Sequence, residues 1–433
     1  MKENFKKNLE NKINKKKVKI GIIGVGYVGL PLAINFVMQN FDVTSLDIDK
    51  KRIRKILKGE SFINYISNDK IQQCLRKKYK LSSNFSKVKE LDVIIICLPT
   101  PLKKNKVPDL SYVEKCIKNI YPYLKNGQLI SFESTTYPGT TEEKIINKIK
   151  TKFKIGKNFF VVYSPEREDP SNKKFQISNI PRIVSGHSKN CVEIGSLIYS
   201  KIINKIVKVS SIKTAEMAKL LENIYRSVNI ALVNEMKIVS KKFDVNIHEV
   251  IEAAATKPFG FGKFNPGPGL GGHCIPIDPF YLAWKAKKLG TKSDFIQLSG
   301  KVNSYVTSWI IDQIKRKNKI NKNTKILLLG VAYKKNIGDI RESPAFEFFE
   351  KFYKNASIEY HDPYVKKLKI KIGNKNLNFY SQKISTKMIK NYDIVILLTD
   401  HDHFNYKMIE KNSKILVDTR GKFNKNNTNI IRL

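Results

Sequence analysis

The sequence predicts an α/β protein in which two Rossmann-like, doubly wound domains are joined by a central helical segment. Short apolar runs alternate with helical patterns in the first half and again in the last third of the chain, which is typical of parallel sheets covered by helices. Between them, residues from Ser211 to about Val245 form one long helical pattern without proline or glycine. The length of 433 residues also exceeds what one compact core accommodates.

From these patterns we expect four parts. Residues 1–17 form a basic tail, which we expect to be unordered, and residues 18–207 form the first Rossmann domain. Residues 208–310 form the central helical domain, and residues 311–433 form the second, smaller Rossmann-like domain. The boundaries fall where the alternation of strands and helices gives way to the long helical pattern and where it resumes.

The composition is that of a globular protein without a membrane segment. Hydrophobic residues make up 41%, which is sufficient for large cores, and no apolar run approaches the roughly 20 residues that span a bilayer. The lysine- and asparagine-rich start, Met1 to Lys17, lacks the apolar stretch of a secretory signal. The 5 cysteines have no paired spacing, which favours a reducing compartment over a disulfide framework or a zinc site. We therefore expect a cytoplasmic protein without membrane insertion.

The formal net charge of +42 raises a basic nucleic-acid-binding protein as an alternative from a different functional class. Such a protein would bind DNA or RNA in a salt-sensitive manner. The lysines, however, are spread along the whole chain among asparagine and isoleucine rather than gathered into one stripe. This distribution indicates a general lysine bias on solvated faces, and we expect no nucleic-acid partner. A basic surface can still attract a diphosphate compound or an anionic membrane surface.

The first predicted strand, Val18 to Ile23, is followed at once by Gly24, Gly26 and Gly29, and a helical pattern begins at Leu30. A G-x-G-x-x-G between a strand and a helix is the dinucleotide-binding fingerprint. The three glycines permit a tight turn, the approach of a pyrophosphate and close packing of helix on strand, and the helix N-terminus faces the phosphate charge. The motif predicts a dinucleotide cofactor.

A second predicted strand, Phe41 to Leu46, ends in Asp47, about 20 residues past the glycines. A carboxylate at this position can bind a ribose 2′-hydroxyl, whereas it would repel a 2′-phosphate. The sequence therefore predicts NAD rather than NADP as the cofactor.

Three further predicted strands each end in a polar loop. They are Leu91 to Leu98 followed by 99–101, Gln128 to Phe132 followed by 133–139, and Phe159 to Tyr163 followed by 164–170. Because ligands of parallel sheets bind at the carboxyl ends of the strands, we expect the chemistry to take place at these loops.

The central segment carries a pair of polar residues on a helix and then a loop rich in glycine and proline. Lys219 and Asn223 are four residues apart, so they share one face of the long helix. The loop from Lys257 to Asp278 delivers a single thiol, Cys274, four residues before a carboxylate. We interpret this thiol as a nucleophile rather than as a small buried hydrophobe.

The neighbouring His273 has no metal-ligand spacing to other histidines. We expect it to contact the substrate or to make a structural hydrogen bond rather than to act as the catalytic base. No metal site is expected.

A thiol beside a dinucleotide fold suits the two-step oxidation of an alcohol to a carboxylate. The first hydride transfer gives an aldehyde, the thiolate of Cys274 adds to it, and a second hydride transfer leaves a thioester that water cleaves. Lys219 and Asn223 could stabilise the developing oxyanion. Glu168 or Asp278 could activate the water.

The last third repeats the strand–helix alternation. The predicted strands are Lys325 to Leu329, Ser357 to Tyr360, Tyr392 to Leu398 and Lys414 to Val417. This smaller sheet lacks G-x-G-x-x-G, so we expect it to bind a different phosphate compound. The loop from Lys334 to Pro344 follows a strand and would supply cations to that ligand.

Taken in order, these motifs resemble those of the UDP-glucose/GDP-mannose dehydrogenase family from about Val18 to the C-terminus. Within that family the likeness is closest to the UDP-N-acetylglucosamine 6-dehydrogenases of bacterial polysaccharide pathways, on the segments 133–141, 164–170, 254–261 and 267–282. The resemblance implies a homodimer or larger homo-oligomer formed through the central helices.

The resemblance also implies catalytic roles for individual residues. Cys274 matches the nucleophile, Lys219 and Asn223 the pair that binds the oxyanion and water, and Asp278 the acid/base partner. The residues expected beside the reacting sugar carbon and the catalytic water are Thr136 and Glu166, with Glu168 or Asp169 in the second acidic role.

Binding residues follow from the same resemblance. Those expected to contact NAD are Gly24, Gly26, Val28, Gly29, Asp47, Arg52, Thr100, Thr136 and Arg341. Those expected to contact the UDP-sugar are Glu166, Lys219, Asn223, Phe264, Gly271, Lys334 and Arg420.

Two departures bear on the sugar. Ile277 stands where the UDP-glucose branch commonly has lysine, and the Glu-Arg-Glu-Asp segment, 166–169, is one residue shorter than that branch's loop. Both differences favour an N-acetylhexosamine. The expected reaction is oxidation of UDP-N-acetylglucosamine to UDP-N-acetylglucosaminuronate for surface-polysaccharide or O-antigen synthesis, with UDP-N-acetylmannosamine or UDP-glucose as alternative substrates.

Overall fold

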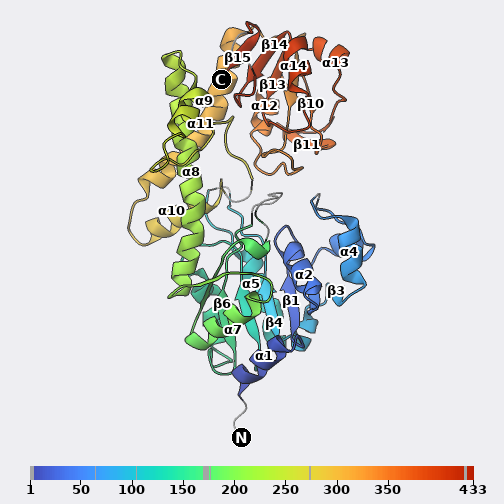
Figure 1. The fold of residues 1–433 in the computed structure, drawn as a ribbon, viewed down its shortest axis with the longest axis vertical. Coiled ribbons are helices and arrows are strands. Elements are labelled where there is room, and N and C mark those ends of the chain that lie inside the picture. The colour runs from blue at the N-terminus through green and yellow to red at the C-terminus, as the bar shows by residue number, and fades with distance from the viewer. Residues whose placement is uncertain are drawn as a thin grey trace. The chain divides into compact units, whose positions relative to one another are not determined.

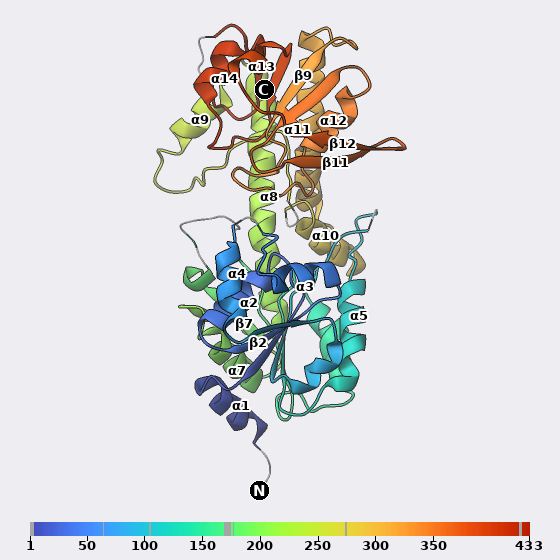
Figure 2. The same ribbon diagram turned by 90° about the vertical axis from the view of Figure 1, so that its right-hand side faces the viewer.

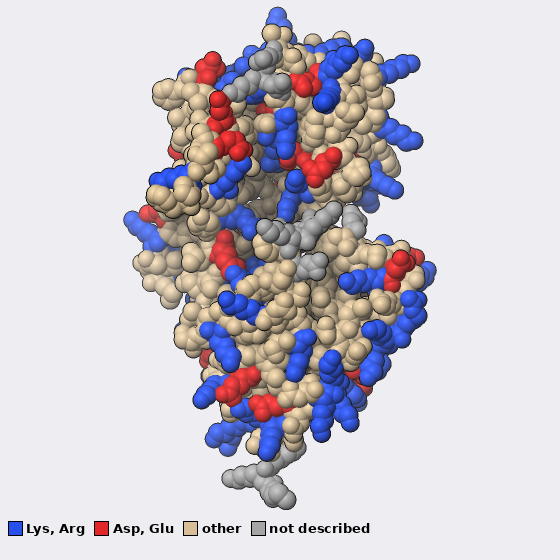
Figure 3. Space-filling model, in the orientation of Figure 1, with Lys and Arg blue, Asp and Glu red and all other residues tan. Residues whose placement is uncertain are grey.

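The computed structural model describes residues 4–63, 65–103, 105–168, 175, 177–272, 275–423 and 427–433. The chain forms two compact units, one of residues Met1–Glu222 with Trp284–Leu289 and one of Asn223–Ala283 with Gly290–Leu433. Among the described residues, no helix is both long and apolar enough to cross a lipid bilayer. Lysine and arginine side chains are scattered over the face shown in Figure 3, as they are along the sequence.

The first unit is built on an eight-stranded sheet with the order β3-β2-β1-β4-β5-β6-β7-β8 (Figure 1). Its strands are β1 (Lys19–Ile23), β2 (Asp42–Leu46), β3 (Tyr79–Ser82), β4 (Val93–Ile96), β5 (Leu129–Phe132), β6 (Phe160–Tyr163), β7 (Arg182–Gly186) and β8 (Ile206–Lys208). All neighbours pair in parallel except β6 and β7, which are antiparallel. The doubly wound sheet predicted from the sequence is confirmed, whereas the antiparallel pair was not foreseen.

Helices cover both faces of this sheet. They are α1 (Phe5–Asn14), α2 (Gly29–Met38), α3 (Lys50–Leu57), α4 (Asn68–Leu75), α5 (Ser111–Ile120), α6 (Asn147–Ile149) and α7 (Lys189–Tyr199), with the short turns η1 (Phe85–Glu90), η2 (Tyr121–Tyr123), η3 (Glu142–Ile146) and η4 (Ile177–Asn179). Strand side chains alternate between faces, so Val93 and Ile95 share a core with α2 and α7, while Ile94 and Ile96 share one with α5.

The expectation of an unordered N-terminal tail is wrong for residues from Phe5 onward. Leu9 and Ile13 of α1 are 2% and 0% exposed and belong to the core that α7 also lines. Lys12 pairs with Asp92 at 2.7 Å, and Lys6 pairs with Glu193 on α7. The helix is held in place by Leu9 and Ile13, two apolar side chains one helical turn apart. The many lysines around them suggested a disordered segment instead.

The second unit contains a five-stranded, fully parallel sheet and a separate antiparallel hairpin (Figure 2). The sheet order is β10-β9-β13-β14-β15. The strands are β9 (Lys325–Leu329), β10 (Ser357–His361), β13 (Ile394–Leu397), β14 (Ile415–Asp418) and β15 (Ile430–Arg432), and the hairpin is β11 (Lys367–Ile372) with β12 (Lys375–Tyr380). The predicted second, smaller sheet is confirmed, and the hairpin and β15 are additions.

The remaining helices are α8 (Ile212–Lys242), α9 (Ile247–Ala254), α10 (Asp278–Lys288), α11 (Asp294–Lys317), α12 (Ala345–Phe352), α13 (Thr386–Lys390) and α14 (Tyr406–Asn412). The predicted long central helix is α8, and the glycine-rich segment after α9 leads into the first turn of α10. Two buried clusters, one on each face of the second sheet, hold this unit together; alternate residues of β9, such as Leu328 and Leu329, point into different clusters.

Candidate active site

The turn between β1 and α2 has the geometry of a phosphate-binding loop. Gly24 has a φ of +96°, and a Cβ built there would lie 2.3 Å from the carbonyl oxygen of Cys97. A Cβ on Gly29 would lie 1.9 Å from the carbonyl oxygen of Gly24, so both positions require glycine for close packing. At Gly26, apart from the glycine itself and its two chain neighbours, no heavy atom of the described residues lies within 4 Å of such a Cβ, which leaves room for a ligand.

Asp47 lies directly after β2, beside this turn, and is 7% exposed. Its Oδ2 accepts a hydrogen bond from the amide of Val25 at 2.8 Å, and its Oδ1 accepts one from the amide of Asp49 at 2.8 Å. Arg52 Nη1 lies 3.2 Å from Oδ2. The carboxylate thus joins the second strand to the glycine turn, as a ribose-binding acid at this position should.

The loops after β4 and β5 are tied to each other and to α8. Thr100 Oγ1 donates to the carbonyl of Thr135 at 2.8 Å, and buried Thr136 Oγ1 donates to Thr140 Oγ1 at 2.6 Å. The carboxylate of Glu216 on α8 accepts from the amides of Gly139 and Thr141 and from the Thr141 hydroxyl, at 2.5, 2.9 and 2.7 Å. Burial raises the pKa of Glu216 to about 7 despite these donors.

Sequence reasoning did not identify Glu216. Its only signal is a carboxylate within an apolar helical face, three residues before Lys219 and therefore on nearly the same side of α8.

A buried arginine organises the loop after β6. Arg182 on β7 is 3% exposed; its Nη2 lies 2.5 Å from Glu133 Oε2, and its Nη1 lies 2.6 Å from Glu166 Oε2. The hydroxyl of Tyr199 donates to Glu133, and the guanidinium lies over the Tyr199 ring. Burial raises the pKa of Glu133, and this effect outweighs the opposing charge of Arg182.

Glu166 differs from Glu133 in the number of its donors. Besides Arg182, the amides of Arg167 and Glu168 donate to its Oε1 at 2.6 and 2.7 Å. Burial alone would raise the pKa of Glu166, but the charge and hydrogen bonds of Arg182 together with the two amides lower it. The side chain is therefore held as a carboxylate. Of the two acids considered for the second role, Glu168 is half-buried, and Asp169 lies outside the described residues.

The helix α8 carries the predicted polar pair on its buried face. Lys219 is 8% exposed and Asn223 is 6% exposed. Among the described residues, no carboxylate oxygen lies within 4.0 Å of the Lys219 ammonium. A buried cation without a counter-ion suits a developing oxyanion.

Asn223 joins α8 to the first residue of α10. Its Nδ2 donates to Oδ2 of Asp278 at 2.5 Å, and Asp278 is 3% exposed. The structure thus brings together two predicted catalytic residues that are 55 positions apart. The predicted nucleophile Cys274 and its neighbour His273 lie outside the described residues.

The glycine-rich segment is anchored within the second unit by close backbone approaches. A Cβ on Gly271 would lie 2.4 Å from the Cβ of Tyr333, and one on Gly267 would lie 2.5 Å from Nη1 of Arg420. Arg420 in turn donates from Nε to the carbonyl of Leu398 at 2.7 Å. Phe264 packs edge-on against a tyrosine of α8, with 5.8 Å between ring centroids. Three predicted substrate-binding residues, Phe264, Gly271 and Arg420, therefore lie on or beside this segment.

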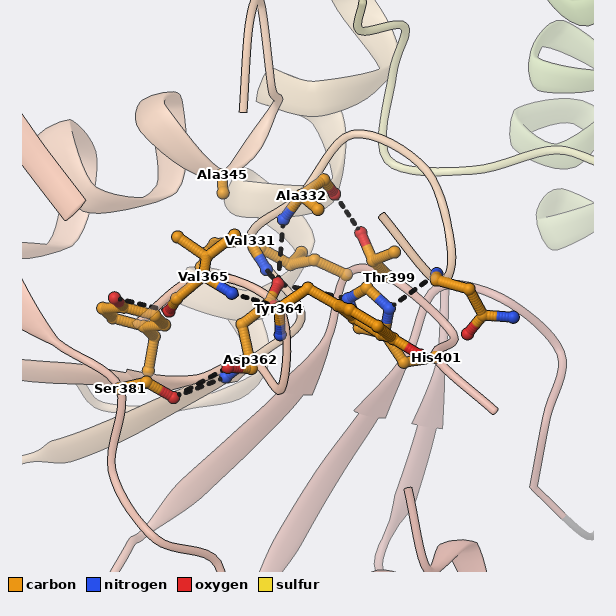
Figure 4. A network of polar contacts seen from close by, with 12 residues as sticks. Val331, Ala332, Ala345, Asp362, Tyr364, Val365, Ser381, Thr399 and His401 are labelled. Carbon is orange, nitrogen blue, oxygen red and sulfur yellow. Dashed lines mark hydrogen bonds and ion pairs between the residues drawn. The ribbon is translucent and has the colours of Figure 1, made fainter. Parts of the chain in front are cut away.

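The loop after β9, which carries Lys334 and Arg341, is held by a buried carboxylate and histidine (Figure 4). Asp362 accepts from the amides of Val331 and Ala332 at 2.7 and 3.0 Å, and its Oδ2 also lies 3.1 Å from Nε2 of His401. Nδ1 of His401 accepts from the amide of Asn336 at 2.9 Å. Although burial favours protonation, the pKa of Asp362 is lowered by His401 and the amides.

Within this loop Lys334 is half-buried, and exposed Arg341 forms an ion pair of 2.6 Å with Asp339.

Asp362 occupies the place in the second sheet that Asp47 has in the first. Each directly follows the strand that pairs with the first strand of its sheet, β10 beside β9 and β2 beside β1. In the second unit, the amides of Tyr364 and Val365 also donate to Asp362, at 2.8 and 3.1 Å, and its side chain is enclosed. The oxygens of Asp362 thus accept hydrogen bonds from groups of the protein itself and are not available to a ribose. The second sheet also lacks the G-x-G-x-x-G sequence that binds a dinucleotide. Among the described residues, no group of three or more potential ligands could hold a metal ion.

Comparisons with known proteins agree with this organisation. The family model for UDP-glucose/GDP-mannose dehydrogenases matches with its NAD-binding domain at residues 18–203, its central domain at 213–305 and its UDP-binding domain at 327–425. The chain belongs to the UDP-glucose/GDP-mannose dehydrogenase family.

Individual relatives match this chain over nearly its whole length. A UDP-N-acetyl-D-glucosamine 6-dehydrogenase of Salmonella typhi is 33% identical over 90% of this chain and 91% of its own length. A UDP-N-acetyl-D-mannosamine dehydrogenase of Methanococcus aeolicus is 34% identical over 97% of this chain and 94% of its own. The solved UDP-D-ManNAc dehydrogenase of Pyrococcus horikoshii has a TM-score of 0.84 at 30% identity, covering 96% of this chain and 98% of that one.

The family makes this protein an NAD-dependent nucleotide-sugar dehydrogenase with a UDP-binding domain. The predictions of family, fold, cofactor and enzyme class are therefore confirmed. Both UDP-N-acetyl-D-glucosamine 6-dehydrogenases and UDP-N-acetyl-D-mannosamine dehydrogenases are among the relatives that this chain matches.

Proposed function

We propose that this dehydrogenase oxidises C6 of UDP-N-acetylglucosamine to the carboxylate, using two NAD and one water per sugar. The single observation that carries the mechanism is the buried hydrogen bond between Asn223 and Asp278. It fixes the residue four positions after Cys274 against the helix that carries Lys219. An acid, an amide and an ammonium are thus available for the chemistry of one thiol.

Two NAD, bound one after the other, would each accept one of the two hydrides that leave C6. In the first step the C6 alcohol loses a hydride and a proton and becomes an aldehyde. The thiolate of Cys274 then adds to the carbonyl carbon, and the Lys219 ammonium with the Asn223 amide stabilises the oxyanion of the adduct. Loss of the second hydride leaves a thioester, which water cleaves to the carboxylate and the thiol.

Water activation requires a base close to the thioester. In this proposal Asp278 accepts the proton of water, and Glu166, kept ionised by Arg182 and two amides, orients water and the sugar. In this proposal Thr136 holds the loop after β5 beside the reacting carbon. Asp47 holds the ribose of NAD, while Lys334 and Arg420 bind the UDP part of the substrate.

Replacing Cys274 tests the mechanism. Cys274→Ser should stop formation of the acid, because an oxygen ester is not formed at a useful rate by an unactivated hydroxyl. Cys116→Ser, at a buried cysteine of α5, serves as the matched control and should retain turnover. The measurement is NADH formed per sugar, for which the wild type should give two. A Cys274→Ser enzyme that still gives two would exclude the thioester.

The choice of sugar rests on Ile277, on the short acidic segment after β6 and on the likeness to the Salmonella typhi relative. The second candidate is UDP-N-acetylmannosamine, since relatives of comparable identity carry that name. Purified enzyme offered UDP-N-acetylglucosamine, UDP-N-acetylmannosamine and UDP-glucose separately with NAD decides between them. Strong turnover of the manno epimer alone would reject our choice. The acid formed would enter surface-polysaccharide synthesis in the cytoplasm.

We further propose a homodimer formed through α8. Large apolar side chains recur along this helix at exposures of 41–62%, namely Met217, Leu221, Tyr225, Leu232, Met236 and Val239, and Phe243, directly after the helix, is 75% exposed. Spacings of three, four and seven residues place them in one stripe, as expected for a helix that pairs with a second copy. Light scattering during size-exclusion chromatography should give twice the mass of 49.8 kDa or a larger multiple. A monomer at micromolar concentration would contradict the proposal.

A further inference from the structure

The second unit contains a cavity of about 830 Å³ that none of the predicted catalytic or binding residues lines. Its walls come from the end of α8, the start of α9, the last turns of α11, and the strands β14 and β15 (Figure 1). A volume of this size is typical of a site for a small organic molecule rather than for a single inorganic ion.

Four cations line this cavity: Lys237 and Lys241 on α8, Lys317 on α11, and Arg432 on β15. Within the described part of the chain, none of the four has a carboxylate oxygen within 4.0 Å. Because the chain has 80 basic and only 38 acidic residues, unpaired lysines are ordinary on its surface, and the distinguishing observation is that four cations, one of them buried, line one cavity.

Lys237 is the most unusual of the four because it is 3% exposed. Its ammonium can donate three hydrogen bonds, and the acceptor present among the described residues is the carbonyl oxygen of Thr419 at 3.3 Å. Burial, and then the charge of the nearby Arg420, lower the pKa of Lys237 to about 7, against the opposing charge of Asp418. A buried ammonium with unused donors at the wall of a cavity would be stabilised by an anionic ligand that accepts its hydrogen bonds.

The acids of the cavity do not supply that partner. Asp418 is occupied by backbone donors, since Oδ1 accepts from the amide of Arg420 at 2.9 Å and Oδ2 from that of Phe423 at 3.0 Å. Asp244 and Glu249 are exposed at the rim. The cationic environment also affects His248, because burial and then Lys237 lower its pKa to about 4, so this imidazole is neutral near pH 7.

We propose that this cavity is a binding site for a phosphate-bearing small molecule, held by Lys237 at its floor and by Lys241 and Arg432 on its walls. Such a ligand would supply acceptors to the ammonium of Lys237 and would relieve the repulsion among the cations. None of the residues proposed above to bind NAD or the UDP-sugar lines this cavity, so the proposal does not depend on that function.

Calorimetric titration of the full-length protein with inorganic pyrophosphate tests the proposal. We expect binding that Lys237→Met weakens at least tenfold, since the variant keeps the side-chain volume but loses the charge. Lys354→Met, at an exposed lysine after α12, is the matched control and should bind like the wild type. Unchanged turnover by Lys237→Met would show that the variant is folded. No binding by the wild type, or equal affinity in Lys237→Met, would overturn the proposal.

A site-resolved measurement then distinguishes this cavity from the loop after β9 that carries Lys334, called here the UDP-binding loop because of its proposed role. Pyridoxal 5′-phosphate carries both a phosphate and an aldehyde that forms an imine with an uncharged lysine, which borohydride makes permanent. Peptide mass spectrometry should find the label on Lys237, and added pyrophosphate should lower that labelling at least fivefold while leaving Lys354 unaffected. Labelling of Lys334 with none on Lys237 would assign the binding to the UDP-binding loop and refute the proposed site.

Discussion

Replacing Arg182 with methionine should destabilise the first unit strongly. The substitution keeps much of the aliphatic volume but leaves Glu133 and Glu166, which lie 2.5 and 2.6 Å from the guanidinium, without their cation. Breaking a buried ion pair by removing one partner costs about 3–5 kcal/mol, because the remaining charge stays buried. Arg182 also donates to Ser164 Oγ at 2.9 Å, which adds about 1 kcal/mol. We expect a total loss of about 4–6 kcal/mol in the free energy of unfolding.

The two tryptophans allow each unit to be followed separately. Trp284 belongs to the first unit and packs on Tyr137 with 5.2 Å between ring centroids, while Trp309 belongs to the second unit. Urea unfolding of a Trp309→Phe background, monitored by fluorescence, therefore reports on the first unit alone. Adding Glu133→Gln to Arg182→Met should restore part of the loss, because one of the two unpaired charges is then removed.

The pH dependence of the Arg182→Met effect has a defined sign. Without the cation, the folded-state pKa values of both carboxyls rise above the unfolded value of 4.5. The cost is then present above that value and disappears as the pH falls below it, because both states bind the proton. The deficit relative to the wild type should shrink between pH 7 and pH 4. A loss under about 1 kcal/mol at pH 7, or one that does not change with pH, would refute the role of Arg182 as the counter-ion.

Three further predictions are tested by urea unfolding monitored by fluorescence, with a Trp284→Phe background for the second unit, and by NADH formation where KM is concerned. The pKa of Glu216 rises from 4.5 in the unfolded chain to about 7 in the folded protein. The free energy of unfolding of the wild type therefore falls as the pH rises through that window. The stability of Glu216→Gln relative to wild type should therefore increase by about 3 kcal/mol from pH 4 to 8, and a constant difference would contradict the shift. His401→Phe should destabilise the second unit by about 2 kcal/mol and raise KM for the UDP-sugar more than KM for NAD; equal effects on both would argue against positioning of the UDP-binding loop. Ile13→Ala should cost the first unit about 2–4 kcal/mol, which an unordered N-terminal helix could not produce.

Features encoded by neighbouring residues were predictable from the sequence. The glycine turn, the acid after the second strand, the long central helix and the main strands of both sheets all follow from short-range patterns that need no knowledge of distant partners. Asp47, for example, binds the turn 22 residues before it because a parallel β-α-β unit fixes that return.

Features that depend on distant partners were not predictable. Arg182 meets Glu133 only because β7 runs antiparallel to β6, and nothing in the short segment before β7 encodes that reversal. Glu216 is buried by partners at Gly139 and Thr141, 77 and 75 positions away, which the sequence around it does not indicate. The cations of the cavity are spread from Lys237 to Arg432, and a uniform lysine bias hid them.

The second sheet shows why a carboxylate placed like Asp47 does not by itself make a dinucleotide site. Around Asp362 the protein supplies, from its own amides and one imidazole, the hydrogen-bond donors that a ribose would otherwise offer to such a carboxylate. For the second sheet to bind NAD through Asp362, His401 would have to be displaced and several buried amides would lose their acceptor. No single substitution could achieve both. Engineering of cofactor preference in this enzyme should accordingly be confined to the surroundings of Asp47, and changes there should leave recognition of the nucleotide-sugar intact.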